Sequence, residues 1–300
     1  MSDRLQRFIE RMKTGEMLMG DGAWGTQMQL MGLQSGDCPE EWNIIHPDKI
    51  KKIARDYFLA GSDLCLTNTF GGTKYRLVRH GFADKVGDFN RTGASLCRSV
   101  ADEFTGLVAG SVGPTGEFLQ PEGMLSEREM YEAFLEQMLA LKEGGVDAIC
   151  IETMYVLDEA LAAIKAAGEL GLFCMACMTF DATSDGFKTM HGTSVEAATR
   201  ALDSAGADVI GTNCGNGIVD MVRIARQMRA LTKKPLMVKS NAGLPEIADG
   251  RMLYLETHQM MASKIQELKE IGVSIVGGCC GTTPEHIRAF REKINSWSPK

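Results

Sequence analysis

Short apolar runs bounded by glycine recur along the chain and alternate with longer stretches of helical periodicity. Four of these runs resemble one another, because each has a glycine at its first or second position, continues through a few apolar residues and ends in polar or thiol-bearing residues. They occupy residues 60–72, 144–154, 205–215 and 271–281. A run of this kind is typical of a strand that is buried on both faces in a parallel sheet.

Four further apolar runs complete a set of eight predicted strands. They occupy residues 17–20, 107–112, 172–179 and 235–239. Between the strands, apolar residues recur at spacings of three and four, which predicts amphipathic helices. The predicted helices cover residues 48–59, 127–141, 157–170, 196–205, 219–231, 257–268 and 284–294, and one more short amphipathic helix is expected at the N-terminus.

The regular alternation of strand and helix predicts the fold class. Eight strand–helix repeats over roughly 250 residues are typical of an α/β (βα)8 barrel, the TIM barrel, and a doubly wound open sheet is the alternative. No linker, low-complexity tract or change of composition divides the chain, so residues 1–300 are expected to form a single domain. In a barrel, the catalytic groups belong on the loops that follow the strands, at the C-terminal rim.

Composition and charge narrow the classes of function. The chain has 32 Lys and Arg against 39 Asp and Glu, a net charge of −7, which argues against a general nucleic-acid binder. No apolar run could span a bilayer, and the charged N-terminus lacks the apolar segment of a signal peptide. We therefore expect a cytoplasmic protein without membrane or nucleic-acid partners, whose nine cysteines are buried thiols, metal ligands or a nucleophile.

Three cysteines fall at the ends of predicted strands. Cys214 follows the sixth strand, and Cys279 and Cys280 follow the eighth among glycines that let the backbone turn. In a barrel, the C-terminal ends of these two strands can converge. Three thiolates with one open position describe a catalytic zinc site at the rim. The alternative is that these residues are small buried apolar side chains.

Two other motifs match known functional patterns, but the residues around them favour a different interpretation. Cys174 and Cys177 form a C-x-x-C, but they lie in an apolar strand whose alternation directs them to opposite faces, so we expect them to fill the core. Residues 20–25 match G-x-G-x-x-G, but no second strand ending in an acid follows at the spacing of a dinucleotide site. This segment is expected instead to present backbone N–H groups and the Asp21 carboxylate to a small ligand.

Glu152 ends another apolar strand. A carboxylate in that position is costly to bury unless a positive or hydrogen-bonding group meets it. That group could be the ammonium of a ligand or a basic residue from a neighbouring loop, and both interpretations stay open at this point.

Seven motifs together make the chain similar to the homocysteine S-methyltransferase family. They are DGAWGTQMQ (21–29), LTNTFGGTKYRL (66–77), GSVGPTGE (110–117), IETMYVLDEA (151–160), GTNCGNG (211–217), NAGLP (241–245) and GGCCGTTPEHI (277–287). They cover nearly the whole chain in the order of the family. The chain looks most similar to the homocysteine-binding module of cobalamin-dependent methionine synthase, and the resemblance implies a zinc-containing (βα)8 barrel.

The resemblance also implies roles for individual residues. Cys214, Cys279 and Cys280 would be the three zinc ligands, and Asp21 and Glu152 would receive the ammonium group of homocysteine. A zinc-bound thiol loses its proton, so homocysteine would attack a methyl group as a thiolate and become methionine.

The remaining implied contacts concern the homocysteine carboxylate and the methyl donor. Backbone at Gly22 and in the Thr67 region would hold the carboxylate, and Asn241 would lie near the open zinc position. The motifs NTFGG and NAGLP resemble the cobalamin-linked branch more than the branches that use S-methylmethionine or betaine. These 300 residues lack the folate, cobalamin and reactivation modules of that branch, so the expected donor is methylcobalamin on a separate corrinoid protein.

Three alternatives to this function stay open. The donor could be S-methylmethionine or S-adenosylmethionine. The chain could be a non-catalytic module that binds zinc or an amino acid and needs partner domains for turnover. It could also be a different barrel enzyme, such as a hydrolase or a redox enzyme that uses the C-x-x-C.

Overall fold

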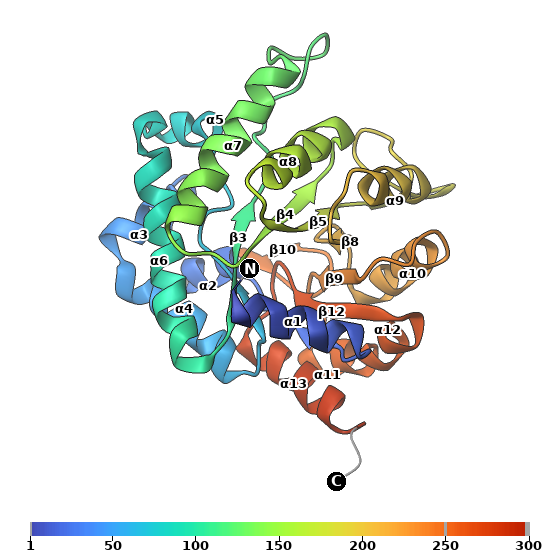
Figure 1. Ribbon diagram of the computed structural model, residues 1–300. Helices are drawn as coiled ribbons and strands as arrows, with labels where there is room; N and C mark the ends of the chain where they lie inside the picture. Colours follow the sequence, from blue (N-terminus) through green and yellow to red (C-terminus); the bar gives the residue numbers. More distant parts are fainter. Residues whose placement is uncertain (1, 249–250, 298–300) are drawn as a thin grey trace.

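Eight parallel strands form a nearly closed barrel, and the helices that connect them form its outer layer (Figure 1). The computed structural model describes residues 2–248 and 251–297. The barrel strands are β1 (Leu18–Met19), β2 (Leu64–Leu66), β3 (Leu107–Val112), β4 (Ala148–Met154), β5 (Phe173–Met178), β8 (Val209–Asn213), β9 (Leu236–Ser240) and β12 (Val273–Gly278). From β2 to β12 each barrel strand pairs with the next in chain order, and β12 pairs with β1, so among the described strands of the barrel only the β1–β2 edge lacks strand pairing. The predicted (βα)8 barrel is confirmed.

Most of the connecting helices agree with the predicted periodicity. The longer helices are α1 (Asp3–Lys13), α4 (Pro47–Leu59), α6 (Val86–Phe104), α7 (Glu127–Glu143), α8 (Leu157–Glu169), α9 (Val195–Ser204), α10 (Ile218–Arg229) and α13 (Pro284–Asn295). The shorter ones are α2 (Trp24–Leu30), α3 (Trp42–Ile45), α5 (Lys74–Leu77), α11 (His258–Ser263) and α12 (Ile265–Ile271). The helix predicted at 257–268 is thus two helices, α11 and α12, which meet at Lys264.

Helix α6 is the longest helix described, and the sequence pattern did not predict it. It contains Gly87 and Gly93, and glycine lowers helix propensity by about 1 kcal/mol relative to alanine. Its stability comes from tertiary packing, because Phe89, Cys97 and Val100 on its inner face are buried. Packing of one face therefore outweighs the weak local preference.

Two short hairpins extend from the loops after β5 and β9. They pair β6 (Asp181–Thr183) with β7 (Gly186–Lys188) and β10 (Glu246–Ala248) with β11 (Arg251–Leu253). Neither hairpin belongs to the barrel sheet.

An aspartate precedes three of the strands and ties each of them to its neighbour. In each case the aspartate N–H donates to a backbone carbonyl and the carboxylate accepts the N–H of the same residue, at 2.7–3.0 Å. The pairs are Asp63 with Met19, Asp147 with Val108 and Asp208 with Cys174. The first of them joins β2 to β1, where the barrel would otherwise be open. The glycine-x-aspartate that begins three of the repeated segments therefore fixes the register of the barrel.

The core has two layers, one inside the barrel and one between the strands and the helices. Helix α1 closes the N-terminal end of the inner layer with Leu5, Phe8 and Met12 (Figure 1). Cys177 lies in the inner layer and Cys174 in the outer layer. This placement confirms that the C-x-x-C fills the core from opposite faces of one strand.

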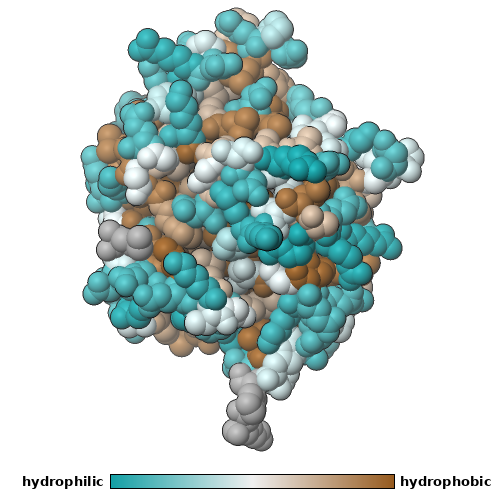
Figure 2. Space-filling model, turned by 45° about the vertical axis from the view of Figure 1, so that its right-hand side comes forward, coloured by the Kyte–Doolittle hydropathy of each residue, from teal (hydrophilic) through white to brown (hydrophobic). Residues whose placement is uncertain are grey.

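The surface mixes polar and apolar side chains. On the face that Figure 2 shows, hydrophobic patches are small and hydrophilic side chains separate them. None of the described helices is long and apolar enough to cross a membrane.

Candidate active site

A cavity of about 280 Å³ opens at the C-terminal ends of the barrel strands. Six of the predicted site residues line it, and they come from the C-terminal ends of five different strands or from the loops that follow them. These residues are Gly22, Thr67, Glu152, Cys214, Cys279 and Cys280. Asp21 and Asn241 are also buried, but they do not line the cavity. The barrel therefore brings together residues that are far apart in the sequence.

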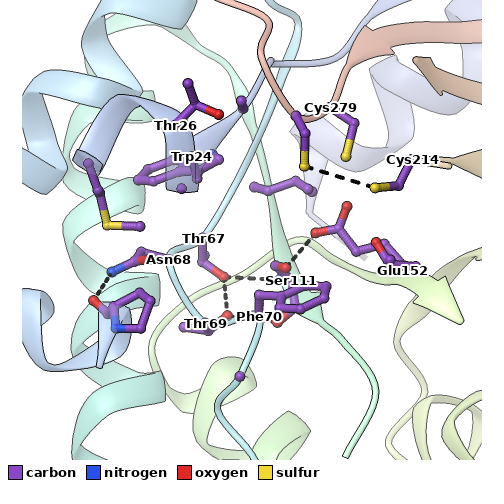
Figure 3. A pocket seen from close by; sticks show the side chains of 18 of the residues that line it. Trp24, Thr26, Thr67, Asn68, Thr69, Phe70, Ser111, Glu152, Cys214 and Cys279 are labelled. Carbon is purple, nitrogen blue, oxygen red and sulfur yellow. Dashed lines mark hydrogen bonds between the residues drawn. The ribbon is translucent and has the colours of Figure 1, made fainter. Parts of the chain in front are cut away.

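The three predicted cysteines meet on one side of this cavity (Figure 3). Their Sγ atoms all lie within 4.8 Å of one another, and the Sγ atoms of Cys214 and Cys280 are 3.9 Å apart. Tetrahedral zinc with sulfur at about 2.3 Å separates its sulfur ligands by about 3.8 Å, so one ion fits this spacing. The six other cysteines are buried, whereas these three are partly exposed. They could hold a metal ion.

The backbone at the end of β8 turns Cys214 toward the cavity. Its φ of 58° lies in the left-handed region, which few non-glycine residues adopt. The Cys214 N–H donates to the carbonyl of Lys239 at 3.1 Å, and the Cys214 carbonyl accepts the N–H of Asn216 at 2.8 Å. The neighbouring strand and the following loop thus fix an unfavourable turn at a predicted metal ligand.

A tight turn at the end of β12 presents Cys279 and Cys280. A Cβ atom on Gly278 would lie 2.2 Å from Oγ1 of Thr282, so only glycine allows this turn. The Thr282 hydroxyl donates to the Cys279 carbonyl at 2.7 Å, and the Cys279 N–H donates to the Ser240 carbonyl at 2.7 Å. These bonds hold both cysteines at the rim.

The three thiols resist ionisation without a cation. The pKa of Cys279 is raised well above its usual range, first by its hydrogen bond with Cys214 and further by burial. Contact with Cys279 lowers the pKa of Cys214, but contact with Cys280 and burial raise it to about 11. Contact with Cys214 lowers the pKa of Cys280, but contact with Cys279 raises it to about 12. Adjacent thiolates repel one another, so a bound cation is what would favour their ionised form.

Asp21 lies beneath the cavity with both carboxylate oxygens occupied. Oδ1 accepts a hydrogen bond from Lys239 Nζ at 2.9 Å, and Oδ2 accepts from Trp24 Nε1 at 2.7 Å and from the Leu66 N–H at 2.8 Å. The side chain has no solvent exposure. Asp21 is therefore already paired with a cation of the protein.

Lys239 is a buried residue of the cavity that the sequence interpretation missed. Its Nζ lies 2.9 Å from Asp21 Oδ1 and 3.8 Å from Glu152 Oε2, and it lines the cavity. Burial alone would lower the pKa of Lys239, but Asp21 and Glu152 raise it above its usual range, so the residue is a cation. A lysine inside an apolar strand was the available signal, because lysine is almost never fully buried without a partner.

Glu152 is the carboxylate that faces the cavity. Its Oε1 accepts a hydrogen bond from the Ser111 hydroxyl at 2.6 Å, and Figure 3 shows the carboxylate between Ser111 and the thiols. Burial raises the pKa of Glu152, while Lys239 and Ser111 act in the opposite direction. Among the described residues, Oε2 has only the distant Lys239 contact at 3.8 Å, so it can accept a hydrogen bond from a ligand.

Gly22 and Thr67 lie on the wall that was expected to hold a ligand carboxylate. A Cβ atom on Gly22 would lie 2.8 Å from Thr282 Oγ1. This position therefore has no room for a side chain, and the backbone itself forms the wall. The Thr67 N–H donates to the Ala109 carbonyl, and its Oγ1 accepts the Ser111 N–H at 3.0 Å. The N–H and the hydroxyl of Thr67 are thus both hydrogen-bonded to β3, the strand that contains Ser111.

Asn241 lies in the loop after β9, close to the cysteine turn. The next residue, Ala242, donates its N–H to the Cys280 carbonyl at 2.9 Å. Asn241 is buried, and its Oδ1 has no hydrogen-bond partner among the described residues. Buried polar atoms nearly always have a partner, and a cation would provide one.

Comparisons with known proteins identify the family to which the chain is similar. Residues 18–294 match the family model described as homocysteine S-methyltransferase. A methionine synthase from Mycobacterium leprae is 35% identical over 303 residues, which cover 96% of this chain and 24% of that protein. A methionine synthase from Mycobacterium tuberculosis is 35% identical over 292 residues, which cover 91% of this chain and 24% of that protein. The chain spans about a quarter of the length of these relatives.

Solved structures support the fold. The oxidised form of the homocysteine methyltransferase MmuM from Escherichia coli superposes with a TM-score of 0.78 at 21% identity, covering 97% of this chain and 100% of that one. Its metallated form gives a TM-score of 0.76 with the same coverage.

Proposed function

The chain belongs to the homocysteine S-methyltransferase family, and we propose that it methylates the thiol of homocysteine to form methionine. One observation carries the proposal. Three thiols that could share a metal ion line the same cavity as Glu152, whose carboxylate can accept a ligand ammonium. A thiol-containing amino acid presents both a sulfur and an ammonium group to such a cavity.

We propose zinc as the metal, held by Cys214, Cys279 and Cys280. The 3.9 Å sulfur spacing, the raised pKa values of the thiols and the unpaired Oδ1 of Asn241 support a bound cation. Three cysteines leave one of four tetrahedral positions open. Zinc bound there would supply the Lewis acidity that removes a thiol proton at neutral pH, where a free thiol with a pKa of about 8.5 is mostly protonated.

The protein itself would bind and orient the amino acid. Glu152, held by Ser111, would accept the ammonium group, and a positive ligand would favour the ionised carboxylate despite its burial. Asp21 was expected to share this contact. Because its oxygens already accept three hydrogen bonds, we propose that Asp21 acts through Lys239, which it holds beside Glu152.

The other walls would complete the site. Backbone near Gly22 and Thr67 would hold the homocysteine carboxylate, and Trp24, Met28 and Phe70 line the cavity with apolar surface that would exclude water. In the transfer, the homocysteine sulfur forms the new bond to the methyl carbon. The bond between that carbon and its donor breaks, and the thiol proton leaves to solvent.

For the donor, we propose methylcobalamin carried by a separate corrinoid protein. The motifs NTFGG and NAGLP support this branch of the family, as does 35% identity to the methionine synthases against 21% to MmuM. The test is methylation of homocysteine by the zinc-loaded chain with a panel of donors: free methylcobalamin, the methylcobalamin-loaded cobalamin module of a methionine synthase, S-methylmethionine, S-adenosylmethionine and betaine.

The panel separates the candidate functions. We expect slow transfer from free methylcobalamin and much faster transfer from the loaded cobalamin module. Rapid turnover with S-methylmethionine alone would overturn the donor assignment and leave the zinc chemistry in place. Homocysteine binding without methyl transfer from any donor would identify a non-catalytic module.

A further inference from the structure

Strand β4 is irregular at the point where it delivers Glu152. Its pairing with β5 shifts register between Ile151 and Met154, and this bulge contains Glu152 and Thr153. Bulges are common beside active sites, where they redirect a side chain. Thr153 has a φ of 60°, in the left-handed region that is especially unfavourable for a β-branched residue.

The side chain of Asn213 holds Thr153 in this conformation. Asn213 Oδ1 accepts the Thr153 N–H at 2.7 Å, and Asn213 Nδ2 donates to Thr153 Oγ1 at 2.8 Å. Asn213 ends β8, which is separated from β4 by β5, so its buried amide spans one strand of the barrel. Thr179, after β5, fixes Asn213 in turn by donating its hydroxyl to the Asn213 carbonyl at 2.8 Å.

The same amide also reaches the thiols. Asn213 Nδ2 lies 3.8 Å from Cys279 Sγ, and the next residue along the chain is Cys214. Three non-glycine residues in the described part of the chain have a positive φ, and two of them, Thr153 and Cys214, bond to Asn213 or adjoin it. Such conformations persist where the surroundings enforce them, and they cluster at functional sites.

We propose that Asn213 is a positioning residue that keeps Thr153 left-handed and thereby aims Glu152 at the ammonium group of the acceptor. The inference rests on the proposed function, because it assigns Glu152 to that ammonium. Without the amide, Thr153 relaxes toward the extended conformation that β-branched residues prefer. Glu152 then turns away from the cavity, although it is itself unchanged.

The affinity for homocysteine, measured by calorimetry on zinc-loaded protein, tests this role. Asn213→Ala should weaken binding by about 10-fold or more, the effect of losing one charge-assisted hydrogen bond, and by no more than Glu152→Gln does. Thr153→Gly in the Asn213→Ala background should recover most of the loss, because glycine adopts a positive φ without the amide. Asn213→Leu, which fills a similar volume, should behave as Asn213→Ala.

A matched control separates positioning from general damage. Asn216 is a buried asparagine in the loop directly after Asn213. Its side chain donates a hydrogen bond to the Phe180 carbonyl and makes no bond to β4. Any loss caused by Asn216→Ala should not be recovered by Thr153→Gly. Parental affinity in Asn213→Ala, or a loss that Thr153→Gly leaves in place, would overturn the inference.

The inference and the proposed function can fail separately. A parent protein that does not bind homocysteine would contradict the proposed function. In that case a crystal structure of Asn213→Ala still decides the role of the amide. A φ at residue 153 outside the left-handed region would support the positioning role of Asn213, and a φ near the parental value would refute it.

Discussion

The cavity has two walls that differ in how their charges are balanced. The acid wall, formed by Glu152 and Lys239 with Asp21 buried beneath them, contains its own cation, because Lys239 Nζ is 2.9 Å from Asp21 and 3.8 Å from Glu152. The thiol wall, formed by Cys214, Cys279 and Cys280, is a set of sulfurs in mutual contact. Folding alone therefore balances the charges of the acid wall, whereas the thiol wall would be completed by the proposed zinc ion.

Because of this difference, substitutions in the two walls should affect different properties of the protein. Removing one partner from a buried ion pair leaves an unpaired charge in the interior, which is strongly destabilising. Removing one thiol from the thiol wall leaves a neutral group and no buried charge. Changes in the acid wall should therefore weaken the fold, and changes in the thiol wall should abolish metal binding with little effect on the fold.

The largest effect is expected in the thiol wall. Cys279→Ser should lose zinc and methyltransferase activity together, because a serine hydroxyl does not replace a thiolate as a zinc ligand. Zinc content by elemental analysis and activity with the loaded cobalamin module measure both losses. Cys177→Ser, in the barrel interior, is the matched control and should retain zinc. A zinc-replete, active Cys279→Ser protein would show that the ligands are misassigned.

The two walls also differ in how far the sequence predicts them. The thiol wall was predictable, because each of its cysteines directly follows an apolar strand and parallel strands place their C-terminal ends at one rim. The partner of Asp21 was not, because the pair joins residues 218 positions apart and no local pattern encodes it. Similarly, nothing in the sequence around Asn213 indicates that its side chain bonds to Thr153, 60 positions earlier.

The same distinction holds for the fold. The barrel strands and most of the regular helices follow from local periodicity, so every barrel strand overlaps a predicted run, although β2 covers only the middle of the run predicted at 60–72. Helix α6 depends on burial of Phe89 and its neighbours rather than on local preference. Tertiary packing of this kind cannot be detected in a single sequence with two glycines in the segment.

The second largest effect is expected in the acid wall. Lys239→Met should reduce the free energy of unfolding by about 3–5 kcal/mol, because it leaves Asp21 charged and buried without its partner. Denaturant titration at pH 7 measures the loss. The double variant Lys239→Met with Asp21→Asn should be more stable than Lys239→Met alone, because it removes the unpaired charge. Parental stability in Lys239→Met would mean that the acid wall is not balanced by this pair.

A smaller effect is expected from the one carboxylate that faces the cavity. A hydrogen bond to a charged group contributes about 1.5–3 kcal/mol, so Glu152→Gln should weaken homocysteine binding by about 10-fold or more. The affinity for 4-mercaptobutyrate, which is homocysteine without its amino group, should stay the same. Asp21→Asn should also weaken homocysteine binding more than 4-mercaptobutyrate binding, because Asp21 acts through Lys239, which lies beside Glu152. If Glu152→Gln binds homocysteine as tightly as the parent, Glu152 has only a structural role.

The smallest expected effect is the number of protons released when homocysteine binds, and both walls contribute to it. If the thiol wall holds zinc, homocysteine binds as a thiolate and releases close to one proton per site at pH 7. The release should fall above the free thiol pKa of about 8.5, where the ligand arrives already ionised. Calorimetry in buffers of different ionisation enthalpy measures the number of protons at each pH.

Glu152, in the acid wall, should add to this proton release. Burial raises its pKa in the free protein, and a bound ammonium favours the ionised carboxylate, so binding releases any proton that Glu152 carries. This part of the release should grow toward lower pH and disappear in Glu152→Gln, while the part from the thiol remains. Release that is near zero and flat from pH 6.5 to 9.5 in both proteins would contradict activation of the thiol by a metal. Release that is unchanged by Glu152→Gln would assign all of it to the thiol wall.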